Sequence, residues 1–266
     1  MSTPYRLGRV LIIAGSDSGG GAGIQADIKT VTLLGGYAAT AITALTAQNT
    51  LGVWGVEPVS PGMILAQARA VLEDIGADVI KTGMLGDAAT IAAAAEILVE
   101  ARLPVVVDPV MMAKGGASLL AASAMDALRA EILPRASLLT PNAPEAKALT
   151  GLEIRDLDDM RRAADRLLAT GARSVLLKGG HLEGETVTDL LVGPDGETTF
   201  SGPRVHTRHT HGTGCTLASA CAVGLAQGLP LPEAVGRAWA YVAEAIRHAP
   251  GLGQGAGPLG HGWVLR

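Results

Sequence analysis

The sequence has few aromatic residues, no cluster of basic residues and no long apolar run. Phe, Trp and Tyr make up 3% of the 266 residues, and the formal net charge is −4. A nucleic-acid-binding surface needs basic side chains for phosphates and aromatic ones for bases. A membrane span needs roughly 18 uninterrupted apolar residues, which no stretch of the chain approaches. The sequence therefore predicts neither a nucleic-acid nor a membrane partner.

Cysteine is also scarce, with Cys215 and Cys221 alone in the chain. On one predicted helix these two side chains point in different directions, which argues against a disulfide between them. Residues 1–6 do not resemble a signal peptide, because the apolar run that begins at Val10 is short and ends in Gly and Asp. We therefore expect a cytoplasmic protein.

Several common catalytic motifs are missing. The chain has no G-x-x-x-x-G-K-[ST], no G-x-S-x-G and no H-E-x-x-H, which disfavours a P-loop NTPase, an α/β-hydrolase and a common zinc protease. Residues 21–26 match the loose dinucleotide fingerprint, but the acidic residue expected about 20 positions later is absent. His206, His209 and His211 precede Cys215, so a zinc site stands as an alternative to a polar loop.

Apolar runs and helical periodicities alternate along the chain. They predict strands at residues 10–14, 37–46, 53–59, 78–81, 105–107, 174–178, 186–192 and 197–200. They predict helices at residues 24–34, 63–75, 88–101, 146–150, 157–168, 216–226 and 231–248. This order indicates a parallel sheet covered by helices on both faces, and no linker or repeat divides residues 1–266 into two domains.

Ligands of such sheets bind beyond the carboxyl ends of the strands, and polar residues follow several predicted strands there. Asp108 could hold a metal or a hydrogen-bond donor, or only cap its own loop. Lys178 could bind phosphate, although most lysines are solvent-exposed. Gln48 could present its amide to a ligand or satisfy the turn that follows.

Asn142 and Glu145 have the spacing of a capping box, with Pro144 inside the first helical turn. The same two side chains could lie beside a metal and a phosphate. The two interpretations are compatible.

The segment Thr210–Cys215 leads directly into a predicted helix. Its two glycines permit a tight turn, and the free N–H groups at the helix start would attract an anion such as phosphate. The same helix end is expected to lower the pKa of the Cys215 thiol toward neutrality. In the simpler alternative the loop is only an N-cap and Cys215 a small buried apolar residue. The glycine-rich tail at residues 251–262 could be disordered or lie over this site.

Four motifs and the end of the chain resemble the bacterial hydroxymethylpyrimidine/phosphomethylpyrimidine kinases of thiamine synthesis, which are ribokinase-like. They are residues 14–30, 43–50, 178–181, 211–215 and 257–263. The resemblance implies a three-layer α/β/α ribokinase-like fold with a mostly parallel central sheet and no separate lid domain. It also implies ATP and Mg²⁺ as cofactors, a small pyrimidine substrate and a homodimer.

The resemblance also implies roles for particular residues. Around the pyrimidine it places Gly15, Asp27, Gln48, Met84 and Val110. It assigns catalysis to the loop of Gly212, Thr213, Gly214 and Cys215, and ATP binding to Asn142, Gly212 and Gly214. Glu145 is implied on the metal side, and phosphoryl transfer asks for a cation such as Lys178. His209 departs from the family, which often has Asn there.

The function that follows is ATP-dependent phosphorylation of 4-amino-5-hydroxymethyl-2-methylpyrimidine to its monophosphate and then its diphosphate. Within the superfamily, a pyridoxal kinase is the alternative. A nucleotide- or vitamin-binding sensor without turnover is the alternative from another class of protein, and a zinc hydrolase is a third.

Overall fold

The computed structural model describes residues 6–111 and 124–265, so residues 1–5 of the N-terminal segment considered above lie outside it. Eight strands form the main sheet: β1 (Arg9–Ala14), β2 (Tyr37–Ile42), β5 (Val79–Thr82), β6 (Val105–Val107), β7 (Leu138–Leu139), β8 (Val175–Leu177), β9 (Thr186–Gly193) and β10 (Gly196–Pro203). Their order is β10-β9-β8-β7-β6-β5-β1-β2. Neighbouring strands pair in parallel from β8 through β7, β6, β5 and β1 to β2. Strand β9 pairs antiparallel with both β8 and β10.

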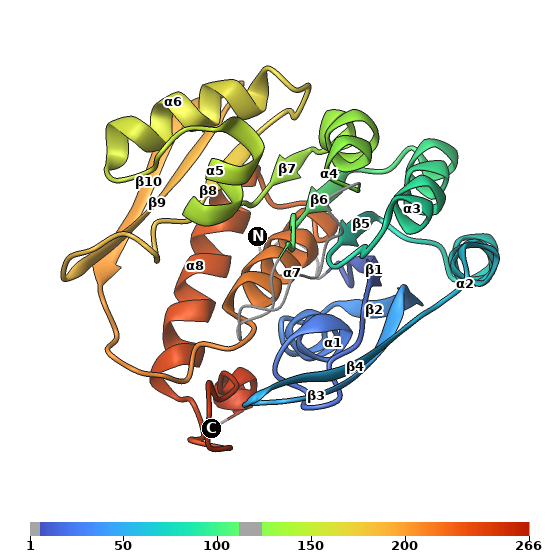
Figure 1. The fold of residues 1–266 in the computed structure, drawn as a ribbon, viewed down its shortest axis with the longest axis horizontal. Helices are drawn as coiled ribbons and strands as arrows, with labels where there is room; N and C mark the ends of the chain where they lie inside the picture. Colours follow the sequence, from blue (N-terminus) through green and yellow to red (C-terminus); the bar gives the residue numbers. More distant parts are fainter. Residues whose placement is uncertain (1–5, 112–123, 266) are drawn as a thin grey trace.

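Helices cover both faces of this sheet (Figure 1). They are α1 (Gly23–Leu33), α2 (Pro61–Asp74), α3 (Ala88–Ala101), α4 (Ala124–Ala127), α5 (Ala143–Thr150), α6 (Leu157–Leu168), α7 (Thr213–Ala226) and α8 (Leu231–Arg247), with short turns at Leu128–Ile132, Leu133–Arg135 and His261–Leu265. Helices α1, α7 and α8 share one apolar core, and α2 to α6 share the other. The predicted three-layer α/β/α fold is confirmed.

The central strands are short apolar runs that are buried on both faces. In β1 every residue from Val10 to Ala14 is at most 1% exposed, as expected for a parallel strand between two helical layers. Helix α7 packs against α1, α8 and three of the central strands, so it is apolar on nearly all sides. Its first turn is partly exposed and lies beside the strand ends of the sheet.

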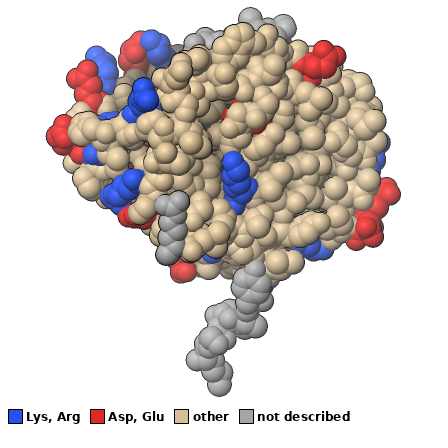
Figure 2. Space-filling model, turned by 90° about the horizontal axis from the view of Figure 1, so that it is seen from below, with Lys and Arg blue, Asp and Glu red and all other residues tan. Residues whose placement is uncertain are grey.

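The strand expected at residues 37–46 is interrupted at Thr43. The Thr43 hydroxyl donates to the Met84 carbonyl at 2.7 Å, and its N–H donates to the Ala14 carbonyl at 3.0 Å. These bonds hold the chain at the end of β1, and from there β3 (Ala44–Asn49) leaves the main sheet to pair with β4 (Gly52–Pro58). The β3–β4 ribbon lies low in Figure 1, and the view from below has few charged side chains across its middle (Figure 2).

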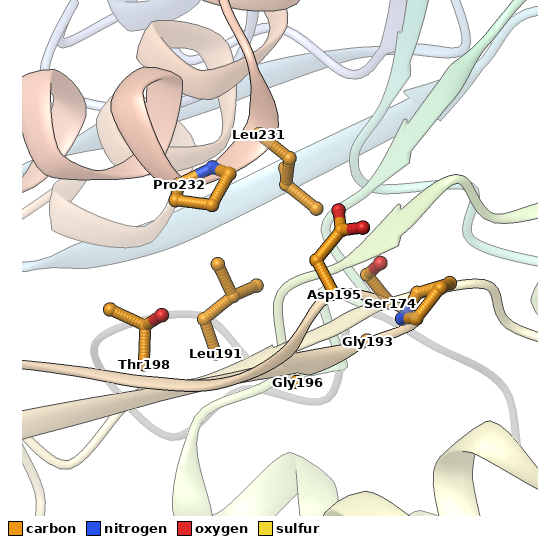
Figure 3. Close-up of a pocket in the computed structure, with 9 residues that line it drawn as sticks. Ser174, Leu191, Gly193, Asp195, Gly196, Thr198, Leu231 and Pro232 are labelled. Carbon is orange, nitrogen blue, oxygen red and sulfur yellow. The ribbon is translucent and has the colours of Figure 1, made fainter.

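A small cavity lies at the amino end of β8. It is lined by Ser174, Leu191, Gly193, Pro194, Asp195, Gly196, Thr198, Leu231 and Pro232 (Figure 3). Its volume of about 20 Å³ has room for one water molecule. Because the polar strand ends lie at the opposite edge of the sheet, this cavity is not the predicted ligand site.

Candidate active site

Polar side chains from neighbouring parallel strands meet where these strands end. Asp108 follows β6, the Thr140 hydroxyl after β7 lies 3.3 Å from Asp108 Oδ1, and Lys178 follows β8. Lys178 Nζ is 3.2 Å from Asp108 Oδ1, and both side chains are nearly buried. These side chains therefore meet at the edge of the sheet where ligands of such folds bind, while their role in binding stays a prediction.

The first turn of α7 lies against this cluster. Gly212 precedes the helix with φ of 84°, and a Cβ there would stand 1.8 Å from the Gly21 carbonyl oxygen, so only glycine fits. No side chain caps the helix start, although the Thr213 N–H donates to the Thr210 carbonyl at 3.4 Å. Uncapped N–H groups at a helix start attract an anion. A Cβ on Gly214 would lie 3.2 Å from Lys178 Nζ and 3.6 Å from Asp108 Oδ2. The loop thus faces both strand-end charges.

The expected pKa of Cys215 is wrong. Burial raises the pKa of this thiol to about 12, and the carboxylates of Asp27 and Asp108 act in the same direction. The Lys81 ammonium and a hydrogen bond from the Gly23 N–H lower it without offsetting burial. A helix N-terminus alone does not produce a thiolate when the sulfur loses its water.

The capping box at α5 is confirmed. The Asn142 side chain accepts the Glu145 N–H at 2.9 Å, and Glu145 Oε2 accepts the Asn142 N–H at 2.7 Å. Glu145 Oε2 also lies 3.9 Å from Lys178 Nζ. Burial raises the pKa of Glu145 to about 7, although Lys178 lowers it. The Glu145 side chain therefore belongs both to the helix cap and to the charged cluster, which are compatible, as the sequence allowed.

Lys178 is not an exposed surface lysine. Burial by itself lowers its pKa, but Asp108 and Glu145 outweigh burial and raise the pKa above its ordinary value. Its backbone N–H donates to the Pro141 carbonyl at 2.9 Å, which places it beside Asn142. A permanent positive charge therefore lies between the capped helix and the glycine loop.

The residues assigned to the pyrimidine come from four parts of the chain. A Cβ on Gly15 would stand 2.4 Å from Met84 Cε, so these two residues touch. Gln48 lies on β3, with its Nε2 atom 3.3 Å from His211 Nε2, immediately before the glycine loop. Val110 is half-buried two residues beyond Asp108. The binding role of each of these residues stays a prediction.

Asp27 is fully buried, and sequence reasoning missed its partner. Lys81, on β5, is also fully buried, with Nζ 3.0 Å from both Asp27 oxygens. The Ser219 hydroxyl on α7 donates to Asp27 Oδ1 at 2.6 Å. The sequence signal that could have found this pair is a lysine at the end of a short strand that is otherwise apolar and buried.

Two of the three histidines of the zinc alternative, His206 and His211, have side-chain partners other than a metal, whereas the buried His209 Nδ1 has no hydrogen-bond partner among the described residues. His206 pairs with Glu185 at 3.0 Å on the surface, and His211 pairs with Asp17 at 2.9 Å in the interior. Over residues 6–111 and 124–265, no group of three or more His, Cys, Asp or Glu side chains could hold a metal ion by itself. The zinc-site alternative gains no support.

The glycine-rich tail is ordered against the glycine loop. The His211 N–H donates to the Gly257 carbonyl at 3.1 Å, and the Thr216 hydroxyl is 2.9 Å from His261 Nε2. Of the two sequence alternatives for residues 251–262, the structure supports the one that places them at the site.

Solved structures with the same fold are kinases. A *Bacillus subtilis* pyridoxal kinase in complex with ADP has a TM-score of 0.89 at 37% identity and covers 97% of this chain and 98% of its own. A *Clostridium difficile* phosphomethylpyrimidine kinase has a TM-score of 0.80 at 42% identity and covers 90% of this chain and 99% of its own. Fold and site together define a ribokinase-like kinase of small molecules.

The sequence profile of the phosphomethylpyrimidine kinase family matches residues 17–260. The chain belongs to this family. It is 50% identical to a *Streptomyces coelicolor* hydroxymethylpyrimidine/phosphomethylpyrimidine kinase, over 96% of this chain and 95% of the relative. It is 55% identical to the *Geobacter sulfurreducens* thiamine biosynthesis bifunctional protein ThiED, over 97% of this chain but only 53% of that longer protein.

Among the helices described for residues 6–111 and 124–265, none is long and apolar enough to cross a bilayer.

Proposed function

We propose that this protein uses ATP to phosphorylate 4-amino-5-hydroxymethyl-2-methylpyrimidine, first to the monophosphate and then to the diphosphate, for thiamine diphosphate synthesis. The observation that carries this proposal is the uncapped start of α7, which lies against Lys178 and Asp108 in a chain of the phosphomethylpyrimidine kinase family. Phosphoryl transfer needs mainly positioning and neutralisation of charge, which backbone N–H groups and a buried lysine supply.

On the pyrimidine side, the carboxamide of Gln48 is suited to an aminopyrimidine. It offers an acceptor and a donor that match an exocyclic amine and the adjacent ring nitrogen. Gly15 and Met84, which touch each other, would pack against the ring, with Val110 at its edge. The Asp27 carboxylate, held by Lys81, would lie behind the ring.

On the nucleotide side, the N–H groups of Gly212, Thr213 and Gly214 would hold the transferred phosphoryl group. Lys178 would neutralise phosphate charge, and Asn142 would lie next to the nucleotide. The hydroxyl oxygen of the pyrimidine attacks the γ-phosphorus, the bond to ADP breaks, and the hydroxyl proton moves to a base, for which Cys215 is our candidate. In the second reaction a phosphate oxygen of the monophosphate attacks instead.

The residues present fit a magnesium ion. Mg²⁺ is usually held by one or two carboxylates together with substrate phosphates. Glu145 and Asp108 both lie beside Lys178 and provide such oxygen atoms. The bound ion would neutralise the phosphates of ATP, while the protein orients them.

Replacing Glu145 by Gln is expected to weaken activation by Mg²⁺ about tenfold or more, without changing the KM for the pyrimidine. The amide keeps the capping bond to Asn142 but removes the charge. A titration of kcat with Mg²⁺ at fixed ATP measures the effect.

The Glu145→Gln variant should not be less stable than the parent. Because burial raises the folded-state pKa of Glu145 to about 7, ionisation destabilises the fold as pH rises from the ordinary value through 7, and Gln removes this penalty. Glu153→Gln, at an exposed residue paired with Lys147, is the control. If Glu145→Gln only lowers the melting temperature and activation by Mg²⁺ is normal, Glu145 is a helix cap and not a metal ligand.

Pyridoxal kinase is the second candidate function, and a specific observation favours it. The pyridoxal kinases among the related structures have TM-scores near 0.89, above the 0.80 of the phosphomethylpyrimidine kinase. Pyridoxal lacks the aminopyrimidine edge that Gln48 matches. A steady-state comparison of kcat/KM for the two compounds decides between the functions, and our proposal expects the pyrimidine to be the better substrate.

We also propose that the protein is a cytoplasmic homodimer. Apolar side chains of β3, β4 and the turn between them are exposed: Leu45, Leu51, Trp54 and Val56. Exposed apolar patches of this kind mark association surfaces. Sedimentation velocity measures the state directly, and a monomer at micromolar concentration would contradict the proposal.

A further inference from the structure

Asp17 and His211 form a buried pair next to the predicted substrate amide, Gln48. His211 Nε2 lies 2.9 Å from Asp17 Oδ2, and the side chains are 10% and 2% exposed, respectively. Asp17 Oδ2 also accepts the N–H groups of Gly21 at 3.0 Å and Ala22 at 2.7 Å, and its Oδ1 accepts the Gly19 N–H at 2.9 Å. The Asp17 carboxylate is thus surrounded by donors.

These donors around Asp17 decide whether Asp17 or His211 carries the hydrogen that lies between them. Burial raises the pKa of Asp17, but hydrogen bonds from His211 and the Ala22 N–H outweigh burial, so the pKa lies below its ordinary value. An ionised carboxylate only accepts hydrogen bonds. The hydrogen must therefore sit on His211 Nε2, and this holds for both the neutral and the doubly protonated imidazole.

The same ring nitrogen also faces Gln48. Gln48 Nε2 lies 3.3 Å from His211 Nε2. Two N–H donors cannot hydrogen-bond to each other, whereas half a turn of the carboxamide brings its oxygen to the same position. In that orientation Gln48 Oε1 accepts part of the hydrogen bond that His211 Nε2 donates to Asp17. Asp17 and His211 therefore favour the amide orientation in which Oε1 faces His211.

The backbone of Gln48 is fixed as well. The Ser18 hydroxyl accepts the Gln48 N–H and donates to the Gln48 carbonyl, both at 2.8 Å. The pairing of β3 with β4 shifts register between Ala47 and Gln48, and such bulges redirect a side chain. With the backbone held, the side-chain torsions of Gln48 decide which amide atom faces His211.

The amide orientation sets how an aminopyrimidine binds, if the proposed function is right. In the substrate, the carbon that bears the amine lies between a ring nitrogen and the carbon that bears the hydroxymethyl group. With Oε1 on the His211 side, the amine binds on that side and the ring nitrogen binds to the Gln48 NH₂. The hydroxymethyl group then points toward the residues that follow His211, which are Gly212 to Cys215. The opposite amide orientation would turn the ring and point this group away.

We propose that Asp17 and His211 are positioning residues that lock the Gln48 carboxamide in the orientation that directs the hydroxymethyl group to the glycine loop. Neither touches the reacting atoms. They act through Gln48, so they select the productive orientation of the ring rather than the strength of binding.

The lock is tested first in the protein without substrate. Nitrogen-15 NMR of the protein labelled at its six histidines reports which imidazole nitrogen carries hydrogen, and His211→Gln identifies the signal. We expect Nε2 of His211 to be protonated at neutral pH. A tautomer with a bare Nε2 and a protonated Nδ1 overturns the proposal. This result does not depend on turnover, so it stands or fails separately from the proposed function.

The consequence for catalysis is tested with Asp17→Asn. In this variant the Asn oxygen stays with the Gly21 and Ala22 N–H groups, and without the carboxylate charge it holds the His211 hydrogen less firmly, so the Gln48 amide is no longer locked in one orientation. We expect kcat to fall about 10- to 100-fold, while the KM for the pyrimidine does not rise and the KM for ATP is unchanged. Gln48→Ala, in contrast, should raise the KM for the pyrimidine.

The control is Asp156→Asn, a cap of α6 away from the site, which should not change kcat. If Asp17→Asn raises the KM for the pyrimidine at unchanged kcat, or only lowers the melting temperature, Asp17 and His211 merely stabilise the loop and the proposal is wrong. If the variant does not fold, the tautomer of His211 in the parent protein still decides.

Discussion

Replacing Cys215 by Ala is expected to lower kcat for the first phosphorylation by about tenfold near neutral pH, which is less than the usual 10²- to 10⁴-fold of a general base, because a thiol with a pKa of about 12 is almost wholly protonated there. The KM for ATP should change little, because the anion site that we propose is made of the backbone of Gly212 to Gly214. The second phosphorylation should suffer much less, since the attacking oxygen of the monophosphate is already largely ionised near neutral pH. Rapid-quench measurement of both steps gives the comparison.

The pH dependence of the same variants tests the role of the thiol. Because the pKa of Cys215 is raised to about 12, the thiolate fraction grows tenfold per pH unit below that value, and kcat should rise with pH between about 6 and 9. Cys215→Ala should lose this slope. Cys215→Asp should be more active than Ala and less dependent on pH, because a carboxylate ionises at lower pH. If Cys215→Ala keeps the slope, the thiol only packs, and the proton leaves to water or phosphate.

Replacing Lys81 by Met is expected to destabilise the protein by about 3–5 kcal/mol at pH 8, because a buried charge loses its partner. Lys81 and Asp27 are both fully buried and are joined through both carboxylate oxygens. For a chain of this size the loss corresponds to a decrease in melting temperature of about 10 °C. Chemical denaturation and calorimetry both measure it.

The stability lost in Lys81→Met should depend on pH in a definite direction. Burial raises the pKa of Asp27, and without Lys81 it rises further, so the variant gains a proton on folding over a wider pH range. The stability difference between parent and Lys81→Met should therefore grow as pH rises from 5 to 8. Lys147→Met, which removes an exposed pair with Glu153, should cost about 0–1 kcal/mol, and a similar loss in both variants would contradict this account.

Much of the fold could be predicted because local rules decide it. The continuous apolar run at Val10–Ala14 is typical of a buried strand, and the spacing of apolar residues over Ala88–Ala101 is typical of a helix. The structure has both elements within a residue of the predicted bounds. The Asn142–Glu145 capping box depends only on residues three apart, so its geometry followed from spacing alone. Strand ends of a parallel sheet share one edge, which brought Asp108 and Lys178 together.

The predictions that were wrong, and the pair that was missed, depend on residues that are far apart in the sequence. The helix start at Cys215 favours a thiolate, but the loss of water around the sulfur is larger and comes from the packing of α7 into the sheet. Lys81 could be judged only once Asp27 was known to lie beside it, 54 residues earlier in the chain. The break at Thr43 depends on the Met84 carbonyl, which no local pattern contains.

The most direct test of the central claim is product analysis. The purified protein is incubated with Mg·ATP and 4-amino-5-hydroxymethyl-2-methylpyrimidine, and the mixture is followed by mass spectrometry. We expect the monophosphate to appear and then convert to the diphosphate, with one ADP formed in each step. Binding of both compounds without any ADP would indicate a sensor, and phosphorylation of pyridoxal but not of the pyrimidine would assign the alternative kinase; either result would contradict the proposed function.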